Sequence, residues 1–518
     1  MRSGLRKWAE VLAPAGLIAV VFASAGVAQN EAPLSVIDWL GTQPKPELAR
    51  PEALIKPDEP PVAKTALAPD VTVKPLGEGG PREIGLVPDT ITGLPRTLWA
   101  GSDVDRVIDL IADLPDLHLP AAQSLLYTVL LAEAGAPGGK SSAGDDLARA
   151  RVAKLMERGA LDPALSLMEQ AGPTSSPAHF DLWMQISLLT GTEDRACALL
   201  QANPHLTRNY GTRIFCTARA QQWEDAALTF GSAQALGLMP PAQLALFERF
   251  LDPEAFDGEA PLPTPRQMDP LSFRLFETIG EPVPTRNLPR AYAVADLRDL
   301  AGWKAQIEAA ERLARAGALP DNRLLGLYTD RQAAASGGVW DRVARLQRFE
   351  TALSTGSADA VAKTLPPVWT AMAEAELEAS FAALFAAPLA TIALDGRAGR
   401  IAQTVQLLSP AYEAAAAAPA RPTLATGIAQ GEVPQGRPAN IMEAAVYDAF
   451  DQAAPRADLV AMVAQDRLGE AILQTLALLH DGARGKARAL TDALATLRAL
   501  GLEDTARRAA LQTLLMDR

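Results

Sequence analysis

Gly159-Ala160-Leu161-Asp162-Pro163 ends one predicted helix and begins the next. Glycine adopts the left-handed conformation after a helix without a Cβ penalty, and Asp-Pro suits the N-cap and the first position of the following helix. Similar punctuation returns at 237–240, 317–321 and 501–504, each time after a segment with apolar residues three and four apart. Helices this short cannot bury their apolar stripes alone, so they must stack on their neighbours. The sequence therefore predicts an all-α protein, an α-solenoid of stacked helical hairpins.

Between residues 144 and 252 the predicted helices form pairs of about 30 residues, the scale of known helix-turn-helix repeats. The pairs are 147–159 with 161–172, 180–191 with 194–203, and 208–221 with 223–237, and a fourth begins at 241–251. In the third pair, small and aromatic residues occur at Trp223, Ala226, Ala227, Phe230 and Ala233. This pattern resembles a tetratricopeptide repeat over one or two units. The resemblance implies a concave surface that binds protein or peptide.

Two breaks rich in proline divide the predicted helices. We predict helical-repeat modules at 103–252 and 290–412 and a C-terminal helical module at 441–518. A Pro-rich linker at 253–289 and an Ala/Pro/Gly-rich linker at 413–440 would join them. Asp103 is expected to cap the first helix. Further helices are predicted at 299–316, 324–335, 339–353, 468–480 and 487–500.

The N-terminus has the pattern of a secretory signal peptide at 1–28. Arg2, Arg6 and Lys7 precede an apolar run at 11–25, and small residues lead to an expected cleavage site after Ala28. The alternative is an uncleaved anchor, although the run 11–28 is slightly short for a membrane span of roughly 20 residues. The body of the protein is therefore expected in the periplasm, either released or anchored to the inner membrane.

The segment 29–102 is predicted to be extended and largely disordered, because its many prolines forbid a regular helix. Near its start lies an apolar island, residues 34–40, and short extended pieces are expected at 71–73 and 83–87. The island has two interpretations: it caps the solenoid of its own chain, or it docks on a partner with Trp39 as the anchor. Its candidate contact residues are Leu34, Val36, Ile37, Trp39 and Leu40.

The net charge of −13 makes nucleic acid and anionic membrane surfaces poor partners. An envelope protein or peptide is the expected partner, with peptidoglycan as the alternative. A membrane becomes a partner only if the signal segment is uncleaved.

Cys197 and Cys216 are the only cysteines of the chain, and they fall on consecutive predicted helices. In an oxidising compartment this arrangement predicts a disulfide between neighbouring repeats. The alternative is a pair of reduced, buried thiols.

Motifs that would carry catalysis are weak. Residues 134–141 fit a relaxed phosphate-binding loop with Lys140 and Ser141, but a helix rather than a strand is predicted before it. The histidines are scattered without metal-ligand spacing, and no Gly-x-Ser-x-Gly elbow occurs. We therefore predict no catalytic residue, no metal and no cofactor.

The predicted superhelix at 103–412 also resembles the non-catalytic arm of soluble lytic transglycosylases. The Glu-Ser pair and the Gly-Leu-Met-Gln turn of their catalytic domain are not present here. We expect an exported, non-catalytic helical-repeat scaffold that mediates protein-protein interaction in assembly or motility of the cell envelope. The alternatives are a peptidoglycan-associated protein related to that arm and a structural envelope protein.

Overall fold

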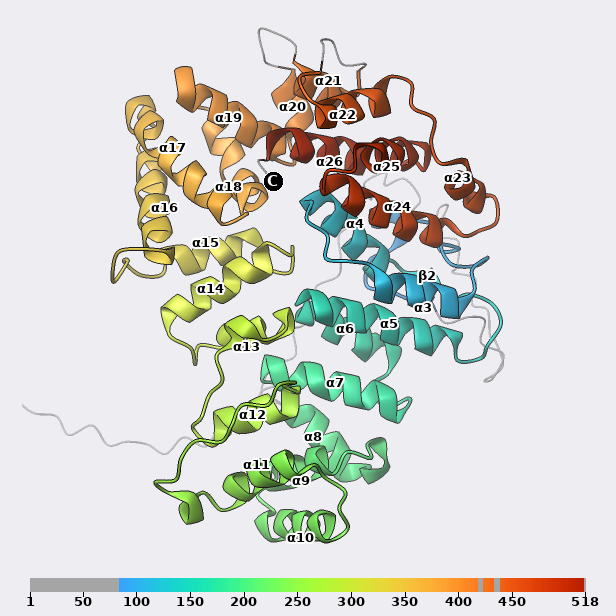
Figure 1. The fold of residues 1–518 in the computed structure, drawn as a ribbon, viewed down its shortest axis with the longest axis vertical. Coiled ribbons are helices and arrows are strands. Elements are labelled where there is room, and N and C mark those ends of the chain that lie inside the picture. The colour runs from blue at the N-terminus through green and yellow to red at the C-terminus, as the bar shows by residue number, and fades with distance from the viewer. Residues whose placement is uncertain (1–82, 418–422, 433–437, 517–518) are drawn as a thin grey trace, which may run out of the picture. The chain divides into compact units, whose positions relative to one another are not determined.

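A computed structural model of the chain describes residues 83–417, 423–432 and 438–516. These residues belong to one compact unit and are almost entirely helical (Figure 1). The all-α prediction is confirmed, and the helices stack in pairs as in helical-repeat proteins. The signal segment, the apolar island and the rest of the chain up to residue 82 lie outside the described residues. None of the described helices is long and apolar enough to span a membrane.

The first part of the described chain holds the predicted pairs. Its elements are β1 (Glu83–Ile84), α2 (Asp89–Thr92), α3 (Val104–Asp113), α4 (Pro120–Leu131), β2 (Ala134–Gly135), α5 (Ala143–Arg158), α6 (Leu161–Ala171), α7 (Pro177–Thr190), α8 (Glu193–Ala202), η2 (Pro204–Leu206), α9 (Tyr210–Arg219), α10 (Trp223–Ala235) and α11 (Pro241–Leu251). From α5 to α11 each helix packs on the next in chain order. Gly159 ends α5 with a φ of 82°, and Asp103 caps α3 by accepting from the Arg106 amide, as predicted.

The short strands β1 and β2 pair antiparallel, so the predicted extended piece near residue 83 is confirmed in part. The later elements are η3 (Pro253–Phe256), α12 (Pro270–Thr278), η4 (Thr285–Asn287), η5 (Arg290–Tyr292), α13 (Ala293–Asp296), α14 (Trp303–Ala314), α15 (Asp321–Thr329), α16 (Val339–Ser354), α17 (Ala358–Glu374), α18 (Glu378–Ala390), α19 (Gly396–Leu408), α20 (Tyr412–Ala416), α21 (Leu424–Gln430), α22 (Ile441–Asp451), α23 (Ala457–Val463), α24 (Leu468–Ala483), α25 (Ala487–Ala499) and α26 (Glu503–Leu515).

Several details differ from the sequence-based expectation. The segment 413–440, predicted as a linker, contains the helix α21 and buries Ile428 and Ala429. The segment 253–289, predicted as a linker, contains α12, which packs on α7 and buries Phe273 and Phe276. The helix predicted at 324–335 ends at Thr329. The Gln347 amide donates to the Tyr328 and Arg331 carbonyls at 2.8 and 2.7 Å. This side chain therefore satisfies carbonyl groups at the C-terminal end of α15 and just beyond it.

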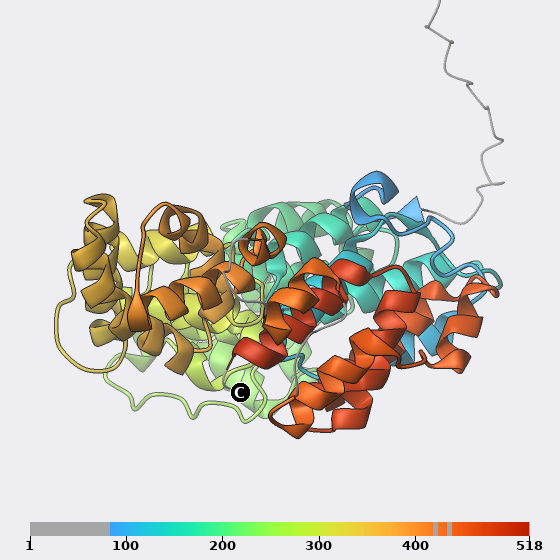
Figure 2. The ribbon, with the colours of Figure 1, turned by 90° about the horizontal axis from the view of Figure 1, so that it is seen from above.

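The buried side chains form two clusters that do not follow chain order. Buried residues from 84–295 and from 407–511 form one continuous core, whereas the middle segment, 293–408, has its own core, joined by Met516. Both α24 and α26 pack on α4, and α24 also packs on α3 (Figures 1 and 2). The amide of Ala121 donates to the Gln512 side chain at 2.9 Å. The predicted module boundaries stay predictions, but the first and last predicted modules share a core.

The predicted disulfide is present. Cys197 on α8 is bonded to Cys216 on α9, with 4.9 Å between the two Cα atoms. Both cysteines are buried. Because α8 ends one helix pair and α9 begins the next, the bond joins two consecutive repeats.

Replacing both cysteines by alanine is expected to lower the free energy of unfolding by about 3 kcal/mol, the chain-entropy value for a short closed loop. The cysteines are separated by 19 positions. Urea unfolding of the double variant, followed by circular dichroism, tests this. Wild type unfolded with reductant is the matched comparison and should reach the same midpoint. A double variant as stable as the oxidised wild type would show that the bond contributes nothing.

Candidate functional site

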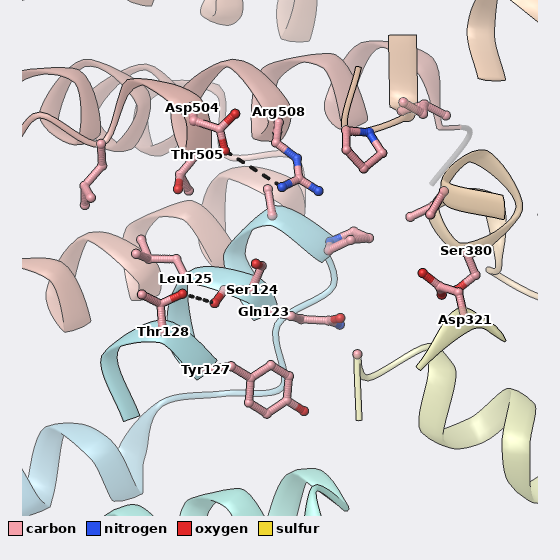
Figure 3. A pocket seen from close by; sticks show the side chains of 18 of the residues that line it. Gln123, Ser124, Leu125, Tyr127, Thr128, Asp321, Ser380, Asp504, Thr505 and Arg508 are labelled. Atoms are coloured by element: carbon pink, nitrogen blue, oxygen red, sulfur yellow. Dashed lines mark hydrogen bonds and ion pairs between the residues drawn. The ribbon is translucent and has the colours of Figure 1, made fainter. Parts of the chain in front are cut away.

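A pocket of about 650 Å³ lies where α4 faces the turn between α14 and α15, together with α18 and α26 (Figure 3). Elements from distant parts of the chain contribute its polar side chains. They include Gln123, Ser124, Tyr127 and Thr128 of α4, Asp321 of α15, Ser380 of α18, and Asp504, Thr505 and Arg508 of α26.

Two side chains of α4 hold the turn after α14. The Gln123 amide donates to the Arg315 carbonyl at 2.9 Å, and the Tyr127 hydroxyl donates to the Ala316 carbonyl at 2.8 Å. The turn continues with Gly317, at a φ of 66°. A Cβ at Gly317 would lie 3.2 Å from the Tyr127 ring, so the close approach favours glycine there. These polar groups of α4 therefore join the first buried cluster, to which α4 belongs, to the turn after α14 in the segment with its own core.

The carboxyl groups of the pocket have different environments. Burial raises the pKa of Asp321 above its ordinary value, although a hydrogen bond from Ser380 opposes the shift. Asp504 accepts from the Tyr412 hydroxyl at 2.9 Å and pairs with Arg508 at 3.8 Å. Glu503 is paired with Arg498 of α25 and Arg507 of α26.

The pocket offers a polar ligand several hydroxyl groups and charged groups to bind. Its hydroxyl groups are those of Thr92, Ser124, Tyr127, Thr128, Ser380 and Thr505. The Ser380 hydroxyl is hydrogen-bonded to the Asp321 carboxyl group, so these two side chains present one polar pair to a ligand in the pocket.

Asp321→Asn should change how stability depends on pH. The pKa of Asp321 in the folded state lies above its ordinary value, so its contribution to stability is complete at low pH and is lost as pH rises through the folded-state pKa. Asparagine does not titrate and still accepts from Ser380. We expect the variant to melt at a higher temperature than wild type at pH 7, with the difference shrinking toward pH 4. A constant difference across this range would contradict the proposed cause, as melting curves at several pH values would show.

The site residues predicted from the sequence lie in different places. Leu34, Val36, Ile37, Trp39 and Leu40 lie outside the described residues, and the cysteines form the disulfide. A helix, α4, precedes the loop 134–141, as predicted, and Lys140 is ion-paired with Asp105 of α3. Throughout 83–516, apart from the gaps at 418–422 and 433–437, no cluster of three or more histidine, cysteine or acidic residues could hold a metal ion.

Sequence reasoning missed an exposed apolar surface on α10. This helix buries only Ala226 and Ala233. Leu228 and Leu236 are 72% and 71% exposed, and Trp223 and Leu238 are 49% and 45% exposed. We call these four residues the α10 face; α10 lies at the end of the helix run opposite α20–α22 (Figure 1). The sequence did contain a signal for this surface. Leu228 lies on a different side of the helix from Ala226 and Ala233, so it could not share their buried stripe.

No protein-family model matches this chain, and no curated protein and no solved structure is significantly similar to it. Its function is therefore inferred from the geometry of the described residues.

Proposed function

We propose that this protein is an exported, non-catalytic helical-repeat scaffold that binds another protein of the cell envelope. The observation that carries the proposal is the α10 face, on the helix pair that resembles a tetratricopeptide repeat. Single exposed apolar residues are normal on a soluble protein. Four large ones on one helix and the turn that follows it are typical of an interaction surface.

The α10 face could accommodate a helix of the partner, because small residues lie beside its exposed leucines. Ala227, Gly231 and Ala235 are also exposed and lie at intervals of four, so they form a stripe of small residues along α10. A Cβ built on Gly231 meets no atom within 4 Å, so the space above the stripe is open. Leucines beside a stripe of small residues suit an amphipathic helix, whose apolar face would cover Leu228 and Leu236.

The apolar island at 34–40 is the second contact in this proposal. It lies on the Pro-rich segment before β1, which is long enough to reach well beyond the helices if extended. Two linked contacts bind one partner more tightly than either contact does alone. The signal peptide predicted from the sequence and the disulfide support a periplasmic location for this binding.

Cross-linking in intact cells, followed by affinity purification and mass spectrometry, tests the proposal. The test variant is Leu228→Glu with Leu236→Glu, which places two charges on the α10 face. The matched control is Leu300→Glu with Ile441→Glu, because these apolar side chains are similarly exposed, at 75% and 72%, but lie away from α10. A third variant lacks residues 34–40.

We expect one or two envelope proteins to be recovered with wild type and with the control, and to be reduced about tenfold or more with the α10 variant. Loss with the deletion as well would assign the island to the same partner. Recovery that is equal for all variants would contradict the proposal. If light scattering shows a dimer that the α10 variant abolishes, the face binds a second copy instead.

A further inference from the structure

A groove of about 1110 Å³ runs along α14 between η4 on one side and the residues from 331 to Trp340 on the other. It is distinct from the α10 face and from the pocket of Figure 3, although Arg315 lines both the groove and that pocket. Its charged lining comprises Arg286, Lys304, Arg312, Arg315 and Arg331, opposed by Asp296 and Glu308. A basic groove in a chain with a net charge of −13 is a local reversal of sign.

Two of these cations have no carboxylate partner within 4.0 Å among the described residues, namely Arg286 and Arg312. Arg312 instead donates to the Thr285 and Leu288 carbonyls. Its pKa is lowered by burial first, and then by the nearby charges of Arg290 and Arg315. An anion bound beside Arg312 would relieve this repulsion.

Carboxylates offset part of this charge, because Glu311 pairs with Arg315 at 4.0 Å and Asp330 pairs with Arg331 at 3.0 Å. Asp296 accepts from the Thr285 hydroxyl, and burial raises the pKa of Asp296 above its ordinary value. Glu308 lies 3.7 Å from Lys304, so it neutralises only one exposed cation. The remaining positive charge belongs mainly to guanidinium groups, which bind carboxylates through two parallel hydrogen bonds.

The groove has the length of a short extended peptide. Lys304, Glu308, Arg312 and Arg315 follow one side of α14 over about 16 Å, at 1.5 Å per residue. About five residues of extended chain cover this distance. Trp303 and Trp340 lie at the Lys304 end, with ring centroids 5.0 Å apart. Trp340 is partly exposed there and offers a contact for one apolar side chain.

We propose that this groove binds an acidic peptide segment of a partner protein, with its carboxylates on Arg286, Arg312 and Arg315 and an apolar side chain against Trp340. The proposal rests on the protein-binding function above and names the chemistry of a second recognition site. A peptide is favoured over an acidic glycan because Trp303 is only 8% exposed and its indole donates to the Leu327 carbonyl. Trp303 therefore offers no open ring face to a sugar, which leaves the partly exposed Trp340 as the aromatic contact of the groove.

Fluorescence anisotropy with the purified protein and a labelled oligoglutamate peptide ending in leucine tests this inference. The groove variant is Arg286→Glu with Lys304→Glu, both at exposed positions of the lining. The control is Arg323→Glu with Lys363→Glu, which makes the same charge change at exposed positions of α15 and α17 outside the groove. Circular dichroism verifies that both variants fold.

We expect saturable binding that weakens about tenfold in the groove variant, changes little in the control, and falls as salt concentration rises. No binding to wild type, or equal loss in both variants, would overturn the proposal. Tighter, groove-dependent binding of labelled oligogalacturonate than of the peptide would overturn it in favour of a glycan. Because a synthetic probe is used, the result is independent of whether the α10 face captures a partner in cells.

Discussion

Arg151→Met is expected to lower the free energy of unfolding by about 3 kcal/mol or more, since it leaves several buried carbonyl groups without a donor. Arg151 of α5 is 1% exposed. Its guanidinium donates to the carbonyls of Leu130, Ile84 and Ala132 at 2.6, 2.7 and 2.8 Å. These carbonyls belong to the last turn of α4, to β1 and to the residue that follows α4, so one side chain fixes the point where β1 joins the helices.

The charge of Arg151 is costly to bury. Burial lowers the pKa of this guanidinium to about 10, and no carboxylate of the described residues lies within 4.0 Å of it to compensate. The three carbonyl bonds must therefore outweigh the desolvation of the group. This balance explains why methionine, which fills similar space without donors, should not restore stability.

Urea unfolding of Arg151→Met tests this prediction, with Arg149→Met as the control on the same helix. Arg149 is partly exposed and pairs with Asp146 of the same helix, so its replacement should change stability by less than about 0.5 kcal/mol. Hydrogen exchange at the Leu86 and Glu133 amides, which donate across the strand pair, should accelerate only in the Arg151 variant. Equal stability of the two variants would mean that the carbonyl bonds are dispensable.

Trp99→Ala is expected to cost about 3 to 5 kcal/mol, the range for removing a buried aromatic side chain. Trp99 is completely buried. Its ring lies over Gly469 of α24, where an added Cβ would come within 2.2 Å of the ring. The Gly469 amide donates to the Leu98 carbonyl at 2.9 Å, so backbone and side chain together join the first described residues to the last helices.

Gly469→Ala provides a second test of the same junction, because a methyl group there forces Trp99 to move, at a cost of about 1 to 3 kcal/mol. Both variants should accelerate hydrogen exchange in α24 and α26, which can be measured by mass spectrometry. Trp223→Ala is the control, since Trp223 is 49% exposed and should matter far less to stability. Unchanged exchange in α24 and α26 would show that they are held independently of Trp99.

The sequence by itself determined the helices and the order of the early pairs. Gly159 and Pro163 mark a boundary through local backbone preferences, which act within a few residues and can therefore be read along the chain. The disulfide could also be predicted from the sequence, because Cys197 and Cys216 fall on helices that are consecutive in sequence and so pack together. Arg151 carried no such signal, since an arginine on a predicted helix normally faces solvent.

Only the tertiary structure decided which distant helices meet. The packing of α24 on α3, the Trp99–Gly469 contact, the pocket beside Tyr127 and the groove beside Arg312 all join residues far apart in sequence. An amphipathic stripe indicates that another element must cover the apolar side of a helix. Many helices have apolar stripes of similar width, so the pattern alone does not select which of them packs there. The choice among them depends on side-chain shape and on buried polar groups that find partners only in the folded chain, and these determine both the closed core and the binding surfaces.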